Sequence, residues 1–469
     1  MITRRFTQPG YILLLFLFMG FVVSCSSLNE VDKPKNELDR TLDPEIQQIL
    51  REISSDRIRS NIIQLVDFHT RHTLSETQSD QVGIGAARRW ILSELEKYSE
   101  DSGGRLQVKF QSYMQRPTER IPQEVEIVNV VATLPGVSPE SKDRIYIVSG
   151  HYDSRASDLM DAEIFAPGAN DDASGTAAMM EMARVMSRYE FDATIIFMAV
   201  AGEEQGLFGA RHFAEEAKLN NLEIGGMITN DIIGSSISDN GAIYKNTVRL
   251  FAEGIPPNHE NSSIVLAYIN TGGENDLPTR QLARNIKETS EGYLPNMNVN
   301  IIYRRDRYLR GGDHIPFLEE GYPAVRFTEP NEDFRYQHQD VRNEDDVQYG
   351  DLLNYIDFEY IAQVTKVNAA GLANLAKAPA TPKNAGISIS QLENNTTLRW
   401  QTNTEPNLAG YAIVWRETTS PVWQYSKFVE DTNTVTIEKV SKDNYIFGVS
   451  AVSKGGHISP AAYPLPYSD

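Results

Sequence analysis

Apolar residues recur at helical spacing in the first hundred positions of the chain. A helix is predicted to begin at Pro44, because proline suits the first turn of a helix. A second helix is predicted over 84–98, where Trp90, Ile91 and Leu95 share one face. The apolar positions of the first helix are Ile46, Ile49, Leu50 and Ile53.

Farther along, short apolar runs alternate with helical stretches. The runs are typical of buried strands, and their alternation with helices predicts an α/β domain. We expect a mixed, mostly parallel central sheet flanked by helices, in a domain that spans 44–378. The predicted strands are 144–149, 193–200, 226–229 and 323–328, and the predicted helices between them are 174–188 and 209–218.

The pattern becomes entirely strand-like after a proline-containing linker at 379–382. Four short alternating segments predict a C-terminal all-β sandwich over 383–469. Three of the four tryptophans lie in these strands and turns, as core anchors would. Trp400, the Gly410-Tyr411 step and the segment 445–452 resemble a fibronectin type III domain, which would serve as a spacer or a binding surface. The segments are 397–401, 410–416, 434–438 and 445–452.

The N-terminus has the features of a signal peptide over 1–24. Arg4 and Arg5 precede a thirteen-residue apolar run, which is shorter than the roughly 20 residues that a spanning helix needs. The chain has a single cysteine, Cys25, so it cannot form an intramolecular disulfide or a thiolate metal cluster. The sequence Val-Val-Ser-Cys at 22–25 resembles the bacterial lipobox, whereas the alternative is a plain secretory signal.

The lipobox resemblance implies where the mature protein resides. Cys25 would carry the lipid, and 25–43 would link the anchor to the folded part. We therefore expect an extracytoplasmic protein of the bacterial cell envelope, periplasmic or on the cell surface, attached to a membrane through Cys25.

Composition narrows the class of partner. The chain has 469 residues, with 44 Lys and Arg against 64 Asp and Glu, a formal net charge of −20. Affinity for nucleic acid comes mainly from Lys and Arg, so this charge disfavours a nucleic-acid binder. Hydrophobic residues at 41% and charged residues at 23% are typical of a globular chain.

Acidic and imidazole side chains follow the ends of several predicted strands, where ligands gather in open α/β sheets. Two imidazoles and several carboxylates form a nitrogen and oxygen donor set suited to Zn²⁺, and carboxylates can bridge two metals. Each motif alone has a structural explanation, such as a helix N-cap for the Asn-Asp-Asp run. Their co-occurrence in this order points instead to a shared site. The segments are 151–153, 167–175, 201–206, 230–231 and 336–340.

The combined motif set resembles that of a zinc-peptidase family. The motifs are HYDS at 151–154, PGANDDASG at 167–175, AGEEQG at 201–206, Asn230-Asp231 and His338. That family contains bacterial leucyl aminopeptidases, glutamate carboxypeptidases and glutaminyl cyclases, and the resemblance spans about 60–376. It implies a zinc exopeptidase fold and two zinc ions, with Glu203 as general base and Asp153 orienting a ligand histidine. By this resemblance, His151 and Asp231 hold one zinc, Glu204 and His338 hold the other, and Asp171 bridges both.

The resemblance implies a dizinc exopeptidase that hydrolyses extracytoplasmic peptides, and we expect an aminopeptidase. Two zinc ions sharing a water lower its pKa, and Glu203 can take its proton and pass it to the leaving amine. Two alternatives are a single-zinc acyltransferase like glutaminyl cyclase and a non-catalytic binding protein of the same fold. The intact loops 168–175 and 201–207 favour the peptidase, and the complete ligand set argues against a non-catalytic protein.

A second segment, 310–317, also resembles the family. It places Asp313 and His314 in the pocket wall or directly behind the metal ligands, although a turn closed by Asp313 and Pro316 explains the pattern equally well. Tyr308 is the nearest candidate for a tyrosine that steadies the oxyanion. The neighbouring basic residues form either a solvated loop or a clamp for a substrate carboxylate; they are Arg304, Arg305, Arg307 and Arg310.

Overall fold

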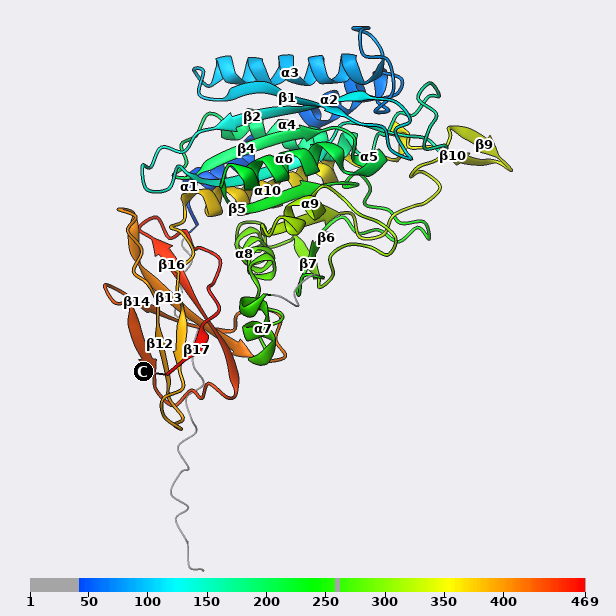
Figure 1. Ribbon diagram of the computed structural model, residues 1–469. Coiled ribbons are helices and arrows are strands. Elements are labelled where there is room, and N and C mark those ends of the chain that lie inside the picture. The colour runs from blue at the N-terminus through cyan, green and yellow to red at the C-terminus, as the bar shows by residue number, and fades with distance from the viewer. Residues whose placement is uncertain (1–41, 258–261, 469) are drawn as a thin grey trace, which may run out of the picture. The chain divides into compact units, whose positions relative to one another are not determined.

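The computed structural model describes residues 42–257 and 262–468 (Figure 1). The predicted signal peptide, 1–24, and Cys25 lie outside the described residues. The helices are α1 (Pro44–Glu52), α2 (Ser55–Asp67), α3 (Gly83–Asp101), α4 (Ala173–Met186), α5 (Glu203–Gly206), α6 (Phe208–Leu219), α7 (Ser263–Asn270), α8 (Pro278–Tyr293), α9 (His314–Glu319) and α10 (Phe358–Lys377), with a 3₁₀ turn, η2, at Leu353–Tyr355.

An eight-stranded mixed sheet forms the centre of the larger part, in the order β1-β2-β4-β3-β5-β8-β6-β7. The pairs β3–β4, β3–β5, β5–β8 and β6–β7 are parallel, and β1–β2, β2–β4 and β6–β8 are antiparallel. The carboxyl ends of the parallel central strands β4, β3, β5 and β8 therefore lie at the same edge of the sheet. The strands are β1 (Gln107–Gln115), β2 (Val125–Leu134), β3 (Arg144–His151), β4 (Thr194–Val200), β5 (Glu223–Asn230), β6 (Thr247–Ala252), β7 (Asn298–Ile302) and β8 (Ala324–Thr328).

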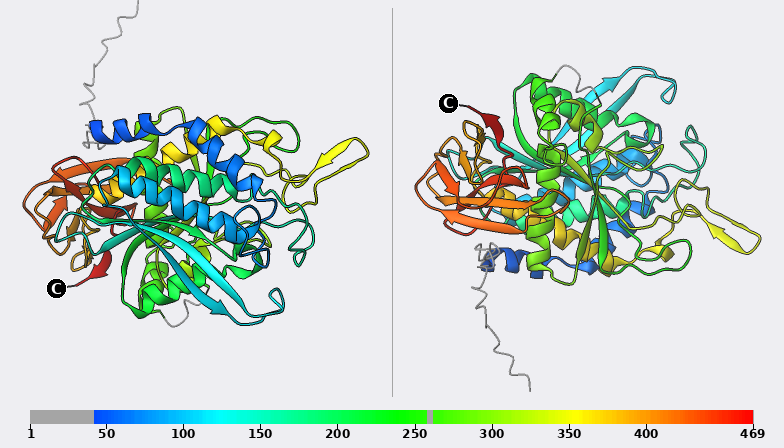
Figure 2. Two further views of the ribbon diagram at one scale, coloured as in Figure 1. Left: turned by 90° about the horizontal axis from the view of Figure 1, so that it is seen from above. Right: turned by 90° about the horizontal axis from the view of Figure 1, so that it is seen from below.

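Helices cover both faces of this sheet, as the views of Figure 2 show. On one face, α4 packs against β3, β4 and β5, and α2, α3 and α10 pack around it. The other face is covered by α6 and α9, where Phe213 and Phe317 join a core with Met198 of β4. Strands such as β4 are buried along their whole length because both faces of the sheet are covered. This confirms the predicted α/β class.

The C-terminal part consists of two further sheets, β15-β12-β11-β17 and β14-β13-β16. Side chains of both sheets, including Trp400, Trp415 and Phe447, share one core, which confirms the all-β sandwich. The likeness to a fibronectin type III domain and the division at 379–382 stay predictions. The strands are β11 (Gly386–Ser388), β12 (Thr396–Arg399), β13 (Leu408–Glu417), β14 (Tyr425–Val429), β15 (Thr434–Ile437), β16 (Tyr445–Ser453) and β17 (Leu465–Tyr467).

Buried polar contacts join the sandwich to the larger part. Asp276, just before α8, pairs with Arg284 of α8 at 3.2 Å and with Arg416 of β13 at 2.6 Å. Asn374 of α10 donates to the carbonyl of Ile458 at 3.0 Å and accepts from its amide at 3.1 Å. The sandwich is therefore held by specific contacts and not only by the linker.

Every predicted strand and helix has a counterpart within a few residues of its predicted bounds. A small hairpin, β9 (Arg342–Glu344) with β10 (Val347–Tyr349), was not predicted; it follows the loop that carries His338. Among the helices of the described ranges, none combines the length and apolar character needed to cross a membrane.

Candidate metal centre

The carboxyl ends of β3, β4 and β5 bring the predicted site residues to one edge of the sheet. His151 is the last residue of β3, Glu203 and Glu204 open α5 just after β4, and Asp231 directly follows β5. Gly202 makes the turn from β4 into α5 in the left-handed region, at φ 74°, which favours glycine. The prediction that these side chains gather at strand ends is confirmed.

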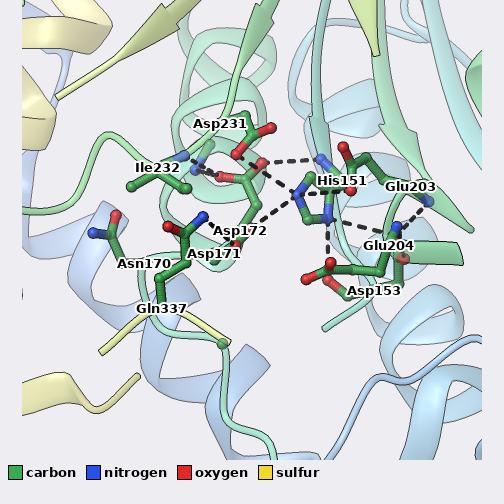
Figure 3. Close-up of polar contacts among 12 residues, drawn as sticks. His151, Asp153, Asn170, Asp171, Asp172, Glu203, Glu204, Asp231, Ile232 and Gln337 are labelled. Carbon is green, nitrogen blue, oxygen red and sulfur yellow. Dashed lines mark hydrogen bonds and ion pairs between the residues drawn. The ribbon is translucent and has the colours of Figure 1, made fainter. Parts of the chain in front are cut away.

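Close packing brings the 167–175 loop to the same edge. A Cβ on Gly175 would lie 2.1 Å from the carbonyl oxygen of Asn230, so only glycine lets α4 approach β5 this closely. The approach places Asp171 and Asp172, which lead into α4, beside Asp231 (Figure 3).

Asp171 lies between two histidines. Its Oδ1 is 3.1 Å from Nε2 of His151, and its Oδ2 is 2.9 Å from Nε2 of His338. His338 comes from the loop after β8 and also lies 3.1 Å from Oε2 of Glu204. One carboxylate therefore reaches both imidazoles with different oxygens.

The donor atoms form two groups that fit metal ions. Each group has one imidazole and two carboxylates, and its ligand atoms lie within 4.8 Å of one another. Nε2 of His151 and Oε1 of Glu204 are buried atoms that make no hydrogen bond within the described residues. Nitrogen and oxygen donors without sulfur suit Zn²⁺. The groups are His151, Glu203 and Asp231, and Asp171, Glu204 and His338.

Glu203 belongs to one of the two metal groups, which the sequence did not predict. Oε2 of Glu203 lies 4.0 Å from Nε2 of His151, close to the 3.9 Å that separates the same nitrogen from Oδ1 of Asp231. Geometry alone therefore places Glu203 within reach of a metal. Its assignment as a base rests on the resemblance and needs an experiment.

Asp153 contacts the Nδ1 ring nitrogen of His151, as the resemblance implies, and it has a second contact as well. The backbone oxygen of Asp153, at 3.2 Å from Nδ1 of His151, is nearer than the carboxylate at 3.6 Å. The carboxylate accepts the backbone N–H groups of Glu203 at 3.3 Å and Glu204 at 3.1 Å. Asp153 thus fixes the turn that presents both glutamates.

Asp172 connects three elements of the site. Its carboxylate accepts the amide of His151 at 3.0 Å, the amide of Gly175 at 2.9 Å and the amide of Ile232 at 3.3 Å (Figure 3). It is the N-cap of α4, as the structural explanation of the Asn-Asp-Asp run suggested. The two neighbouring aspartates therefore have different tasks.

Arg71 and Asp351 hold the loop that carries Asp171. The buried guanidinium of Arg71 donates to four carbonyl oxygens, among them those of Pro167 and Gly168. Asp351 accepts the amides of Asn170 and Asp171 at 2.7–2.9 Å. Sequence reasoning missed both residues, because nothing near them in the sequence links them to the 167–175 loop.

Arg326 supports Asp231 from inside the sheet. It is fully buried on β8, and its guanidinium lies 2.9 Å from Oδ1 of Asp231 and 3.1 Å from Oδ2 of Asp306. Sequence reasoning read 323–328 only as a buried strand. A charged residue within such a strand was the available signal, because a buried charge requires a partner.

We expect Arg326→Met to destabilise the metal-free chain by about 3–5 kcal/mol, because the buried Asp231 loses its arginine partner and Asp306 keeps only Arg307 as an arginine partner among the described residues. Urea unfolding at neutral pH measures the change. Arg304→Met, which alters an exposed arginine, is the matched control. A shift of the Arg326→Met midpoint no larger than that of the control would contradict the role of Arg326.

Burial and the neighbouring charges shift the pKa values of His151 and Glu203. Burial lowers the pKa of His151, but the carboxylates around it, first that of Glu203, raise it well above its ordinary value. Burial and the nearby charges of Asp231 and Glu204 raise the pKa of Glu203 well above its usual range. Crowded carboxylates of this kind are stabilised by a bound cation.

Asp313 and His314 are both buried near the centre, but neither is among the residues that line its cavity. Burial raises the pKa of Asp313 to about 7, with Asp153 and Asp231 adding to the effect. Nε2 of His314 lies 2.8 Å from the carbonyl oxygen of Arg305, and His314 belongs to neither metal group.

The structure does not bring Tyr308 to the centre. Its side chain is 78% exposed, and its ring lies 3.7 Å from the guanidinium carbon of Arg304. In this arrangement Tyr308 cannot hold an oxyanion at the metal groups. The physical reason is the Arg304 contact, which keeps the ring on the surface of its loop.

The four arginines of the predicted basic cluster, 304–310, have different contacts and do not act together. Arg305 pairs with Glu253 at 3.0 Å, and Arg307 pairs with Glu332 at 2.7 Å. Arg307 and Arg310 line the cavity at the centre, whereas Arg304 and Arg305 do not. The cluster as a whole is therefore not a clamp.

The metal groups open into a cavity of about 640 Å³. Asp171, Glu203, Glu204, Asp231 and His338 form part of its wall, and Leu159, Leu207 and Leu309 supply apolar surface. The volume lies within the range of about 300–1,000 Å³ that is typical of small-molecule sites.

Comparisons with known proteins agree with this site. Residues 129–360 match the model of peptidase family M28. A probable zinc metalloprotease of Leptosphaeria maculans is 49% identical over 422 residues, covering 90% of this chain and 97% of the relative.

Solved structures support the fold. The LapA aminopeptidase of Legionella pneumophila aligns with a TM-score of 0.50 at 19% identity, covering 74% of this chain and 78% of that one. An aminopeptidase from Aneurinibacillus sp. strain AM-1 aligns with a TM-score of 0.50 at 15% identity, covering 71% and 96%. At these identities the likeness concerns the fold alone.

Proposed function

The chain belongs to peptidase family M28 and is a zinc metallopeptidase, and from this premise we propose that it is a dizinc aminopeptidase. The observation that carries the proposal is the position of Asp171. Its two oxygens each face a different histidine, at 3.1 Å and 2.9 Å, as a carboxylate that bridges two metals requires. A single-zinc site, as in the glutaminyl-cyclase alternative, would not need both imidazoles at one carboxylate.

In the proposed site, His151 and Asp231 would hold one zinc, Glu204 and His338 would hold the other, and Asp171 would be a ligand of both. Zinc ions held there would polarise the scissile carbonyl and lower the pKa of an attacking water. Asp153, through the amides of Glu203 and Glu204, sets the position of the turn that carries a base beside a ligand.

Glu203 is the proposed general base. Its side chain is 12% exposed and lines the cavity, so it reaches both the bound substrate and the metal groups. Its carboxylate takes a proton from the attacking water and returns it to the amine of the leaving group. Asp172, Asp351 and Arg71 keep the opposite wall in place during these transfers by holding the loop before α4.

A panel of paired substrates tests the exopeptidase direction. We expect the zinc-loaded chain to cleave Leu-Gly-Gly and to leave N-acetyl-Leu-Gly-Gly uncut, because an aminopeptidase requires a free α-amino group. Equal cleavage of both members would contradict the aminopeptidase proposal. Cyclisation of an N-terminal glutamine without hydrolysis would instead support the acyltransferase alternative.

We also propose that the chain acts outside the cytoplasm on peptides, held to a bacterial envelope by a lipid on Cys25. The support is the lipobox-like sequence at 22–25 behind a short apolar run. In a bacterial host, Cys25→Ser should move the protein from the membrane fraction to the soluble envelope fraction. An unchanged distribution would contradict the anchor.

A further inference from the structure

Four arginines line the cavity that leads to the metal groups. They are Arg120, Arg155, Arg307 and Arg310. Arg120 lies in the connection between β1 and β2, and Arg310 lies in the loop between β7 and α9, so segments distant in sequence converge on this cavity. The chain carries a net charge of −20, which makes this local concentration of positive charge distinctive.

Two of these arginines are already neutralised. Arg155 lies 3.1 Å from Oε2 of Glu204, and its terminal nitrogen lies 2.6 Å from Nδ1 of His338. Arg307 lies 2.7 Å from Glu332. These two guanidinium groups therefore stabilise the protein's own carboxylates.

The other two have no such partner. In the part of the chain that the structure describes, neither Arg120 nor Arg310 forms an ion pair with a carboxylate. Arg310 lies 3.3 Å from Nδ1 of His338 and 5.8 Å from the ring centre of Phe334. A guanidinium has five N–H donors, so these contacts leave most of its capacity unused.

The cavity thus combines the acidic metal groups with two guanidinium groups that form no ion pair with a carboxylate of the described residues. One of them, Arg310, lies beside His338 of a metal group. Arginine binds carboxylates through two parallel hydrogen bonds, and this pairing strengthens where solvent is partly excluded. A short peptide with a free amine at one end and a carboxylate nearby matches this distribution of charge.

We propose that Arg120 and Arg310 bind a carboxylate of the substrate, so that the enzyme prefers short acidic peptides. This inference rests on the proposed peptidase function. The carboxylate is either the C-terminus of a short peptide or the side chain of an acidic residue after the scissile bond.

Two pairs of substrates distinguish these sources. Leu-Gly-Gly and its C-terminal amide differ only in the terminal carboxylate. Leu-Glu-Gly-amide and Leu-Gln-Gly-amide differ only in the side-chain charge. In at least one pair we expect the anionic member to have a kcat/KM about 10- to 100-fold higher, mainly through KM, as befits a charge-assisted hydrogen bond.

Three variants assign the preference to residues. Arg310→Gln and Arg120→Gln should each lower the ratio between anionic and neutral peptide by several-fold. Arg304→Gln is the matched control, because Arg304 lies on the same loop as Arg310 with its side chain against Tyr308 and outside the cavity. It should leave the ratio unchanged.

Binding measured without turnover separates this inference from the proposed function. Calorimetry in a zinc-loaded Glu203→Gln background compares the four peptides directly. A preference for the anionic peptide that Arg310→Gln removes would support the inference even if the wild type hydrolysed none of them. Equal affinities within both pairs, or a preference untouched by both substitutions, would overturn it while leaving the peptidase proposal intact.

Discussion

We expect Glu203→Gln to lower kcat by about 10³-fold while the chain retains its full zinc content. The amide keeps the size of the side chain but cannot accept the proton of the attacking water, and general base catalysis contributes about 10²–10⁴-fold. The ratio of zinc to protein, measured by elemental analysis beside the initial rate, separates this result from metal loss.

The zinc content decides between the two roles that geometry allows for Glu203. Oε2 of Glu203 is 4.0 Å from Nε2 of His151, so a ligand role would appear as zinc loss in Glu203→Gln. Glu215→Gln, on the exposed surface of α6, is the matched control and should change neither quantity. A variant that keeps near-normal rates would show that another group is the base.

The second large effect that we expect is loss of metal in Asp171→Asn. An amide offers one neutral oxygen and one N–H donor, so it cannot present an anionic oxygen toward each histidine as Asp171 does at 3.1 Å and 2.9 Å. Changes to groups that merely support ligands weaken metal binding 10–100-fold, and we expect a direct ligand to exceed about 100-fold. Peptidase activity should fall in parallel.

Equilibrium dialysis against a zinc buffer measures this change. The control is Asp101→Asn, which neutralises an exposed aspartate at the end of α3. Unchanged zinc stoichiometry in Asp171→Asn, at zinc concentrations where the wild type is just saturated, would contradict the bridging role.

The elements predicted from sequence were those with strong apolar signals. Strand β4 is buried along its entire length, and its unbroken apolar run made it visible. Strand β1 was missed because most of its side chains are exposed or half-buried, so it carries no continuous apolar run. Helix α2 was missed although its N-cap, Ser54, accepts a hydrogen bond from the amide of Arg57.

His151, Glu203, Glu204 and Asp231 were predictable because they stand at or just after strand ends in the sequence. Asp171, before α4, and His338, well beyond β8, were assigned through the family resemblance. The surrounding support was not predictable, since it depends on contacts between distant segments. Arg71 reaches the carbonyls of Pro167 and Gly168 across about a hundred residues of sequence. Arg326, a charge within a predicted core strand, did signal a buried partner, but the sequence could not show that the partner is Asp231.

Tyr308 was predicted to lie at the site, but the structure places it on the surface. It was selected for its nearness in sequence to the 310–317 segment, yet its ring lies against Arg304 on the surface. Sequence proximity cannot give the direction of a side chain in an irregular loop. The arginines of the same loop divide for this reason, since Arg305 contacts Glu253 while Arg310 faces the cavity.

Zinc titration of the metal-free full chain tests the central claim most directly. Bound zinc is followed by calorimetry, and the rate on Leu-Gly-Gly is followed in the same samples. The account predicts saturation at two zinc ions per chain, with the full rate reached only as the second ion binds. Saturation at one zinc ion with full activity would contradict the two-metal centre.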